Sequence, residues 1–66
     1  MITVNGTERE LADGTTVAVL LAETDGIPKR GVAVAVDGEV VPRSTWHDVR
    51  IQDGARVEIL TAVQGG

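Results

Sequence analysis

Residues 51–66 read IQDGARVEILTAVQGG, which combines a turn, an alternating segment and an end without charged side chains. The Asp–Gly pair in this stretch is typical of a turn, and residues 56–61 then follow the two-residue period of a half-buried strand. Val57 and Ile59 lie on one side of this strand, and Leu60 lies on the other. We therefore expect the strand to bury its β-branched side and to expose Leu60 on the outer face of a sheet.

The sequence ends in Gly65 and Gly66, and such a pair is uncommon. Because glycine makes up about 7% of average sequence, two glycines fill two given positions in roughly one chain in 200. Glycine has no Cβ, so these residues can enter a narrow passage in which a side chain would collide. We expect the carboxylate of Gly66 to be the reactive group, on an arm whose length and first contacts are set by Val63 and Gln64. The alternative interpretation is an ordinary frayed terminus.

Two pairs of turn residues predict two β-hairpins. Asn5–Gly6 follows the alternating ITV, and Asp37–Gly38 follows VAVAV at residues 32–36. Both pairs suit a type I′ turn, in which both central residues need a positive φ. The return strand of the first hairpin is mostly polar and is expected near an edge of the sheet, whereas residues 32–36 are apolar on both faces and predict an interior strand. Pro42 ends the second hairpin, because it cannot donate a ladder hydrogen bond.

One short helix is expected between the hairpins. Its apolar face is formed by Val17, Leu20 and Leu21. The hydroxyl of Thr15 or Thr16 can cap its first turn. Gly26 suits a C-terminal cap, and Pro28 prevents the helix from continuing. These elements predict an α+β domain in which one helix covers one face of a sheet of four or five strands, although the patterns do not give the strand order.

Composition excludes several classes of function. The 66 residues form one domain that is too small for a deep, enclosed active site. The absence of cysteine excludes disulfides, zinc–thiolate sites and a thiol nucleophile, and it fits a reducing cytoplasm. A net charge of −4 argues against nucleic acid and anionic membranes as partners. The sequence contains neither a recognisable signal peptide nor an apolar run near the ~20 residues that a membrane helix needs.

The only tryptophan, Trp46, stands beside the only histidine, His47. A lone histidine without a second histidine, a cysteine or a clear carboxylate partner is a poor candidate for catalysis or metal binding. We therefore predict structural or surface roles for both residues, with the indole covering one edge of an aliphatic core.

The order of the predicted elements resembles the ubiquitin-like β-grasp fold, in which the first and last strands lie parallel at the centre of a mixed sheet. More closely, VAVAVDGEVVPRS at residues 32–44 and the stretch at residues 51–66 resemble the sulfur carrier family of thiamin thiazole biosynthesis (ThiS). The opening ITVNG and the segment ADGTTVAVLL also match, so the resemblance covers essentially the whole chain. On this basis we expect a β-grasp domain at residues 1–62 and a flexible Gly–Gly tail at residues 63–66.

The resemblance implies a carrier rather than an enzyme. In this family, a separate E1-like adenylyltransferase uses ATP and Mg²⁺ to adenylate the C-terminal carboxylate, here that of Gly66. A persulfide that originates from a cysteine desulfurase then gives a thiocarboxylate, and thiazole synthase takes the sulfur. The chain itself has no GxxxxGK[ST] or GxGxxG motif, so we expect it to bind no cofactor. Leu60, with Ala33 and Ala35, is the predicted apolar docking patch.

Three alternatives stay open. A β-grasp carrier can deliver sulfur to another product, such as the molybdopterin cofactor. A ubiquitin-like modifier would instead form isopeptide bonds through Gly66. An interaction module would use only its sheet, and loss of Gly65 and Gly66 would then be harmless. The small size and the free tail of the chain favour a monomer.

Overall fold

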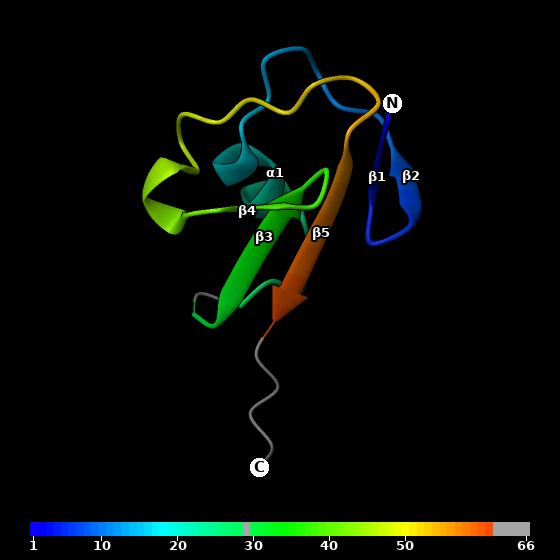
Figure 1. Ribbon diagram of the computed structural model, residues 1–66. Coiled ribbons are helices and arrows are strands. Elements are labelled where there is room, and N and C mark those ends of the chain that lie inside the picture. Colours follow the sequence, from blue (N-terminus) through cyan, green and yellow to red (C-terminus); the bar gives the residue numbers. More distant parts are fainter. Residues whose placement is uncertain (29, 62–66) are drawn as a thin grey trace.

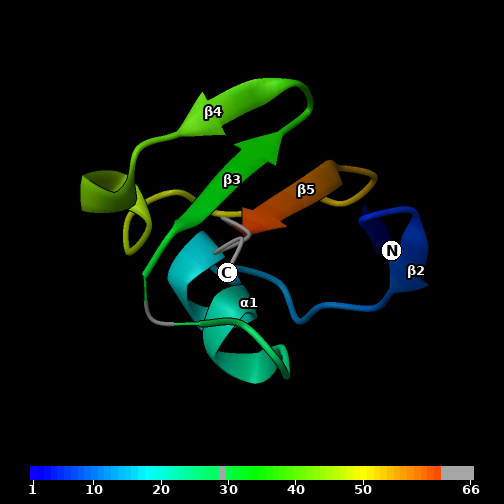
Figure 2. The same cartoon turned by 90° about the horizontal axis from the view of Figure 1, so that it is seen from below.

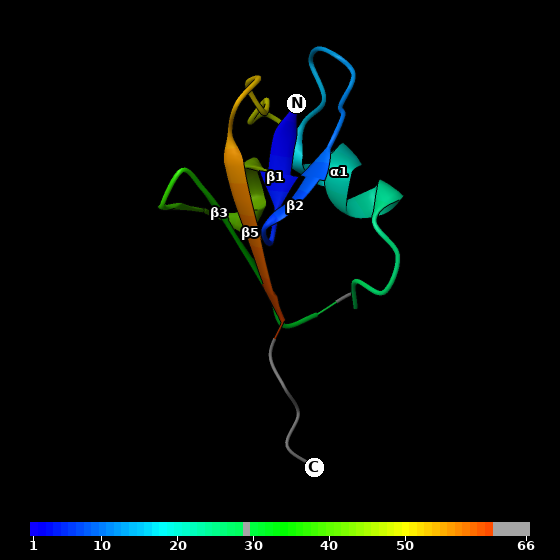
Figure 3. The ribbon, with the colours of Figure 1, turned by 90° about the vertical axis from the view of Figure 1, so that its right-hand side faces the viewer.

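The computed structural model describes residues 1–28 and 30–61, and these residues form five strands and one α-helix. In chain order the elements are β1 (Ile2–Val4), β2 (Thr7–Arg9), α1 (Val17–Glu23), β3 (Val32–Val36), β4 (Glu39–Val41), a 3₁₀-helix (Arg43–Thr45) and β5 (Arg56–Thr61). Figures 2 and 3 show α1 packed on one side of the strands, which gives two layers. The predicted α+β architecture is therefore confirmed.

The five strands form one mixed sheet in the order β2-β1-β5-β3-β4 (Figure 1). β1 and β5 are parallel, with Thr3 opposite Arg56 and Val4 opposite Val57, and the other three neighbouring pairs are antiparallel. The polar strand β2 lies at one edge and β3 lies in the interior, as the sequence predicted. The sequence patterns left the strand order undetermined, and the β-grasp resemblance implied only that the first and last strands lie parallel at the centre, as β1 and β5 do.

Both hairpin turns have the backbone conformation that their sequences predicted. The φ angles are 50° at Asn5 and 82° at Gly6, and they are 51° at Asp37 and 85° at Gly38. A positive φ at both central residues is the requirement of a type I′ turn, whose twist matches that of the flanking strands. These turns therefore fix which residues of each hairpin face each other.

Helix α1 begins as predicted but ends earlier. The hydroxyl of Thr16 accepts a hydrogen bond of 3.3 Å from the backbone N–H of Val19, so Thr16 is the N-cap. At the other end Thr24 is the C-cap, and its N–H donates to the carbonyl of Leu21 at 3.2 Å. The prediction of Gly26 as C-cap was wrong, because the helix has already ended there. Gly26 instead supplies a φ of 81° in the turn that follows.

The core between α1 and the sheet is entirely aliphatic. Its buried apolar residues are Ile2, Val4, Val17, Leu20, Val34, Val41, Ile51, Ala55, Val57 and Ile59. Trp46 packs against the edge of this cluster, and its Nε1–H donates a hydrogen bond of 2.9 Å to the carbonyl of Val41. The guanidinium of Arg43 lies 5.6 Å from the centre of the indole ring. The predicted structural role of Trp46 is therefore confirmed.

Candidate functional site

The candidate site lies at the end of β5, where the described part of the chain stops at Thr61. Figures 1 and 3 show that this end of the sheet points away from the N-terminus and from the loops around residues 10–14 and 50–55. Of the residues predicted for the site, the structure describes Leu60. The other four, Val63, Gln64, Gly65 and Gly66, lie outside the described residues. Their roles therefore stay predictions.

The side chains of β5 alternate as the sequence predicted. Val57 and Ile59 have exposed fractions of 0% and 5%, whereas that of Leu60 is 63%. Burial of the β-branched residues against α1 places the intervening positions on the outer face of the sheet. Leu60 is therefore an outward-facing leucine, one residue before the end of the strand.

Strand pairing places further small apolar residues beside Leu60. Ala33 lies directly opposite Leu60, and Ala35 lies opposite both Glu58 and Val40. Residues that face each other across neighbouring strands share one face of the sheet. The outer face thus carries a continuous apolar surface, here called the outer-face patch, formed by Ala33, Ala35, Val40 and Leu60. The predicted grouping of Leu60 with the two alanines follows from this register.

The sequence analysis missed Val40, which has an exposed fraction of 73%. Its neighbour Val41 is buried, so alternation along β4 predicts that Val40 points outward. That signal becomes useful only when β4 is known to pair with β3, because the pairing brings Val40 next to Ala35.

Charged residues border the outer-face patch on the side away from Thr61. Arg56 Nε lies 3.9 Å from Glu58 Oε1 at the beginning of β5. Both side chains are substantially exposed, so this ion pair contributes little to stability. Along β5, the outer face therefore changes from charged at the beginning of the strand to apolar beside Thr61.

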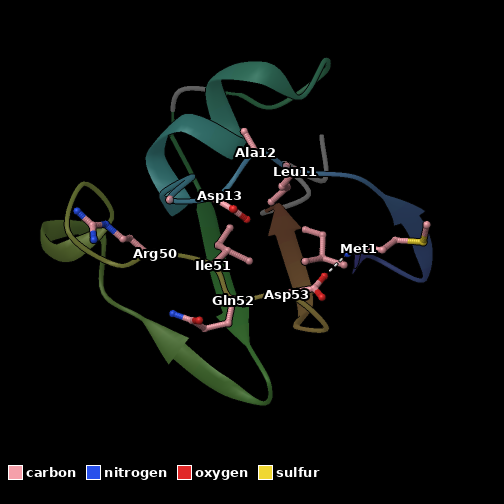
Figure 4. A pocket seen from close by; sticks show the side chains of 10 residues that line it. Met1, Leu11, Ala12, Asp13, Arg50, Ile51, Gln52 and Asp53 are labelled. Atoms are coloured by element: carbon pink, nitrogen blue, oxygen red, sulfur yellow. Dashed lines mark hydrogen bonds and ion pairs between the residues drawn. The ribbon is translucent and has the colours of Figure 1, made fainter.

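A pocket of about 310 Å³ lies at the opposite end of the molecule, between the N-terminus, residues 11–14 and residues 50–53 (Figure 4). At its rim the α-amine of Met1 donates a hydrogen bond to Asp53. This bond raises the pKa of the amine above its usual value and lowers the pKa of the carboxyl. The described residues contain no cluster of three or more His, Asp or Glu side chains placed to hold a metal ion. Leu60, the one predicted site residue that the structure describes, does not line this pocket.

The chain matches the model of the ThiS family over residues 2–66. It belongs to the ThiS family. It is 32% identical over 65 residues to the sulfur carrier protein ThiS of Escherichia coli, and the match covers 98% of this chain and 97% of that protein. The crystal structure of the thiamine biosynthesis protein ThiS from Geobacter metallireducens is similar with a TM-score of 0.83 and 31% identity, and it covers 98% of this chain and 97% of that one. These findings confirm the resemblance and the ubiquitin-like β-grasp fold.

Two longer proteins also contain a segment similar to this chain. A thiazole synthase of Paramagnetospirillum magneticum is 38% identical over 65 residues, which is 98% of this chain and 20% of that protein. A threonine–tRNA ligase of Pelobacter propionicus is 41% identical over 58 residues, which is 86% of this chain and 8% of that protein. The chain thus spans a fifth or less of these two relatives. None of the described helices is long and apolar enough to span a membrane.

Proposed function

We propose that this chain is a carrier that delivers sulfur for the thiazole ring of thiamin, with the carboxylate of Gly66 as its reactive group. The observation that carries the proposal is the match to the ThiS family, which extends through residue 66 and so includes Gly65 and Gly66. The nearly complete coverage of the E. coli sulfur carrier gives further support. In this proposal the folded domain serves other proteins as a handle and performs no catalysis of its own.

The proposed chemistry begins with activation of the carboxylate. A carboxylate is a poor electrophile at neutral pH, because resonance and negative charge both discourage attack on its carbon. An E1-like adenylyltransferase would bind ATP and Mg²⁺, and an oxygen of Gly66 would attack the α-phosphate with release of pyrophosphate. A cysteine persulfide derived from a cysteine desulfurase would then displace AMP and form an acyl disulfide with Gly66. A thiol would attack the donor cysteine's sulfur, form a disulfide with it and release the thiocarboxylate on Gly66. Since the activation consumes ATP, the proposed location is the cytoplasm.

Thiazole synthase is the proposed acceptor of the sulfur. A segment of the P. magneticum thiazole synthase is 38% identical to almost the whole of this chain. In that protein, a domain similar to this one is covalently part of a chain named for thiazole formation. That arrangement supports a direct encounter between this chain and a separate thiazole synthase.

The outer-face patch is the proposed docking surface for the activating enzyme. Binding energy at protein interfaces is concentrated in a few well-packed residues, and exposed ion pairs at the rim contribute little. Leu60 is the largest side chain of the patch and stands directly before Thr61, from which the chain leads to Gly66. Docking at Leu60 would therefore bring the end of the chain close to the enzyme's nucleotide site.

Intact-mass analysis of the protein isolated from its native cells tests the proposed function. We expect a fraction of the protein to carry the mass change of one oxygen-to-sulfur exchange, located by fragmentation at Gly66. Conjugates of high mass joined through Gly66 would instead indicate a protein modifier. Incubation of the thiocarboxylate form with thiazole synthase and with a molybdopterin-forming enzyme identifies the acceptor, and sulfur transfer only to the second would contradict the proposal.

A further inference from the structure

The side chain of Asn5 binds the backbone of β5 near the end of the strand. Its Oδ1 accepts a hydrogen bond of 2.7 Å from the N–H of Ile59, and its Nδ2 donates one of 3.1 Å to the carbonyl of Ile59. A single side chain therefore satisfies both backbone groups of a residue that lies 54 positions further along the chain. The sequence analysis assigned Asn5 a role only in the turn.

These two bonds continue the parallel ladder between β1 and β5. The N–H of Thr3 donates to the carbonyl of Ala55 at 3.1 Å, and the N–H of Asn5 donates to the carbonyl of Val57 at 2.9 Å. The next step of this ladder falls at Ile59, but the main chain has by then turned away at Asn5–Gly6. A side-chain amide has the same kind of donor and acceptor as a peptide group. The side-chain amide of Asn5 therefore pairs with Ile59 in the way that the backbone would have done if β1 had continued.

The position of Ile59 connects this contact with the candidate site. Register places Val4 opposite Val57, so the last four residues of β5 extend beyond β1. Of these four residues, all of them described, only Ile59 has its backbone hydrogen-bonded to the side chain of Asn5. Leu60 and Thr61 follow immediately. Loss of the amide would leave the N–H and the carbonyl of Ile59 to water on this side and would loosen the end of β5.

We propose that Asn5 is a positioning residue for the carrier reaction. By holding Ile59, it fixes the direction in which Leu60 and Thr61 are presented to the activating enzyme. This inference rests on the proposed function, since it assigns a purpose to the fixed end of β5. A positioning role differs from a role in stability alone. A substitution of Asn5 should impair adenylation more than a substitution elsewhere that lowers the stability of the fold by the same amount.

Asp37 provides a matched control in the second hairpin. It occupies the same turn position with nearly the same φ, 51° against 50°. Its Oδ1 accepts a hydrogen bond of 2.9 Å from the N–H of Arg56, and its own N–H donates to the carbonyl of Arg56 at 2.8 Å. The two turn residues thus bind the two ends of β5, and only Asn5 binds the end beside Leu60.

Three variants of the full chain separate the two roles. Asn5→Gly keeps the turn, because glycine adopts a positive φ freely, but it removes both side-chain hydrogen bonds. Asn5→Asp keeps the acceptor for the N–H of Ile59 and loses the donor. Asp37→Gly removes the side-chain bond at the beginning of β5 and keeps the turn. Each is compared with the wild type at a temperature well below its unfolding midpoint.

Amide hydrogen exchange is the readout that does not depend on any enzyme. In Asn5→Gly we expect the amide of Ile59 to exchange roughly tenfold faster relative to the other amides of β5, the size expected from loss of one or two net hydrogen bonds. Asn5→Asp should give a smaller acceleration, and Asp37→Gly should leave the relative exchange of Ile59 unchanged. Equal protection of Ile59 in Asn5→Gly and wild type would overturn the inference.

ATP–pyrophosphate exchange with the cognate activating enzyme is the functional readout. In Asn5→Gly we expect kcat to fall about tenfold with a smaller change in KM, because a displacement of about 1 Å at a reacting group can cost as much as 100-fold. Asp37→Gly should keep both constants within about twofold of wild type. Equal losses in the two glycine variants would overturn the positioning role. A wild-type chain that is not adenylated would instead overturn the proposed function, and the exchange of Ile59 would then decide by itself whether Asn5 fixes the end of β5.

Discussion

Near its end, β5 carries aliphatic residues on both faces, and these have different consequences for the protein. Val57 and Ile59 are buried against α1 and belong to the core, whereas Leu60, the next residue along the strand, is exposed. All three side chains are aliphatic, so hydrophobicity does not distinguish them. The difference comes from the pleat of the strand and from the presence of a helix on one side of the sheet. The inner face holds the fold together, and the outer face is available to a partner.

The largest expected effect lies on the inner face. Ile59→Ala should lower the free energy of unfolding by about 2–5 kcal/mol, because the substitution leaves a cavity in a close-packed core. Urea denaturation measures this change. Leu60→Ala, which removes a similar side chain from the next position, should change the stability by no more than about 0.5 kcal/mol. Similar losses in the two variants would show that the outer face also carries the fold and would break the comparison.

The second prediction concerns the end to which β5 leads. Gly66→Ala should leave the unfolding transition unchanged and should reduce adenylation by the activating enzyme roughly 100-fold, because an added Cβ displaces the reacting carboxylate. ATP–pyrophosphate exchange measures the reaction, and urea denaturation of the same sample is the control. Normal exchange by the variant would contradict the role of Gly66.

A smaller effect is expected from the outer face itself. Leu60→Ala should raise KM for the chain in the adenylation assay by about 5- to 30-fold, which corresponds to the ~1–2 kcal/mol typical of an interface anchor, and should leave kcat nearly unchanged. Val19→Ala is the matched control, because Val19 is also exposed and aliphatic but lies on α1, in the other layer. If both variants bind the enzyme equally well, the outer-face patch is not the docking surface.

The smallest effect is expected at the opposite end of the molecule, between Met1 and Asp53. The hydrogen bond between them lowers the pKa of the Asp53 carboxyl below 3.8 and raises the pKa of the Met1 amine above 8.0. Because the pKa of the carboxyl is lowered, the bond stabilises the fold at pH values above the usual pKa of the group. This contribution is lost as the pH falls through the lowered pKa. Because the pKa of the amine is raised, the bond stabilises the fold at pH values below the usual pKa of the amine. This contribution is lost as the pH rises through the raised pKa.

The difference in melting temperature between wild type and Asp53→Asn should therefore be constant between pH 3.8 and pH 8.0 and should shrink outside that window. Since both groups are exposed, we expect a small difference throughout. Thermal unfolding followed by circular dichroism over a series of pH values measures it. A difference that grows below pH 3.8 would have the wrong sign for this pair.

Local patterns in the sequence were sufficient for much of the fold. The positive φ angles at Asn5–Gly6 and Asp37–Gly38 and the outward direction of Leu60 were predicted from neighbouring residues, and the N-cap was narrowed to Thr15 or Thr16, of which the structure has Thr16. Each depends on a few consecutive positions, because turn geometry, capping and the strand period are short-range effects. The end of α1 was wrongly predicted at Gly26, since Thr24 satisfied the last turn first.

By itself, then, the sequence determined the elements, their inner and outer faces, and the chemical character of its final residues. Only the tertiary structure decided the strand order, the position of Val40 beside Ala35 and the bonds from Asn5 to Ile59. The physical reason is the distance along the chain over which each contact acts. A period or a cap is fixed within one turn or one strand, whereas the hydrogen bonds from the amide of Asn5 to Ile59, 54 positions away, form only when β1 and β5 have come together.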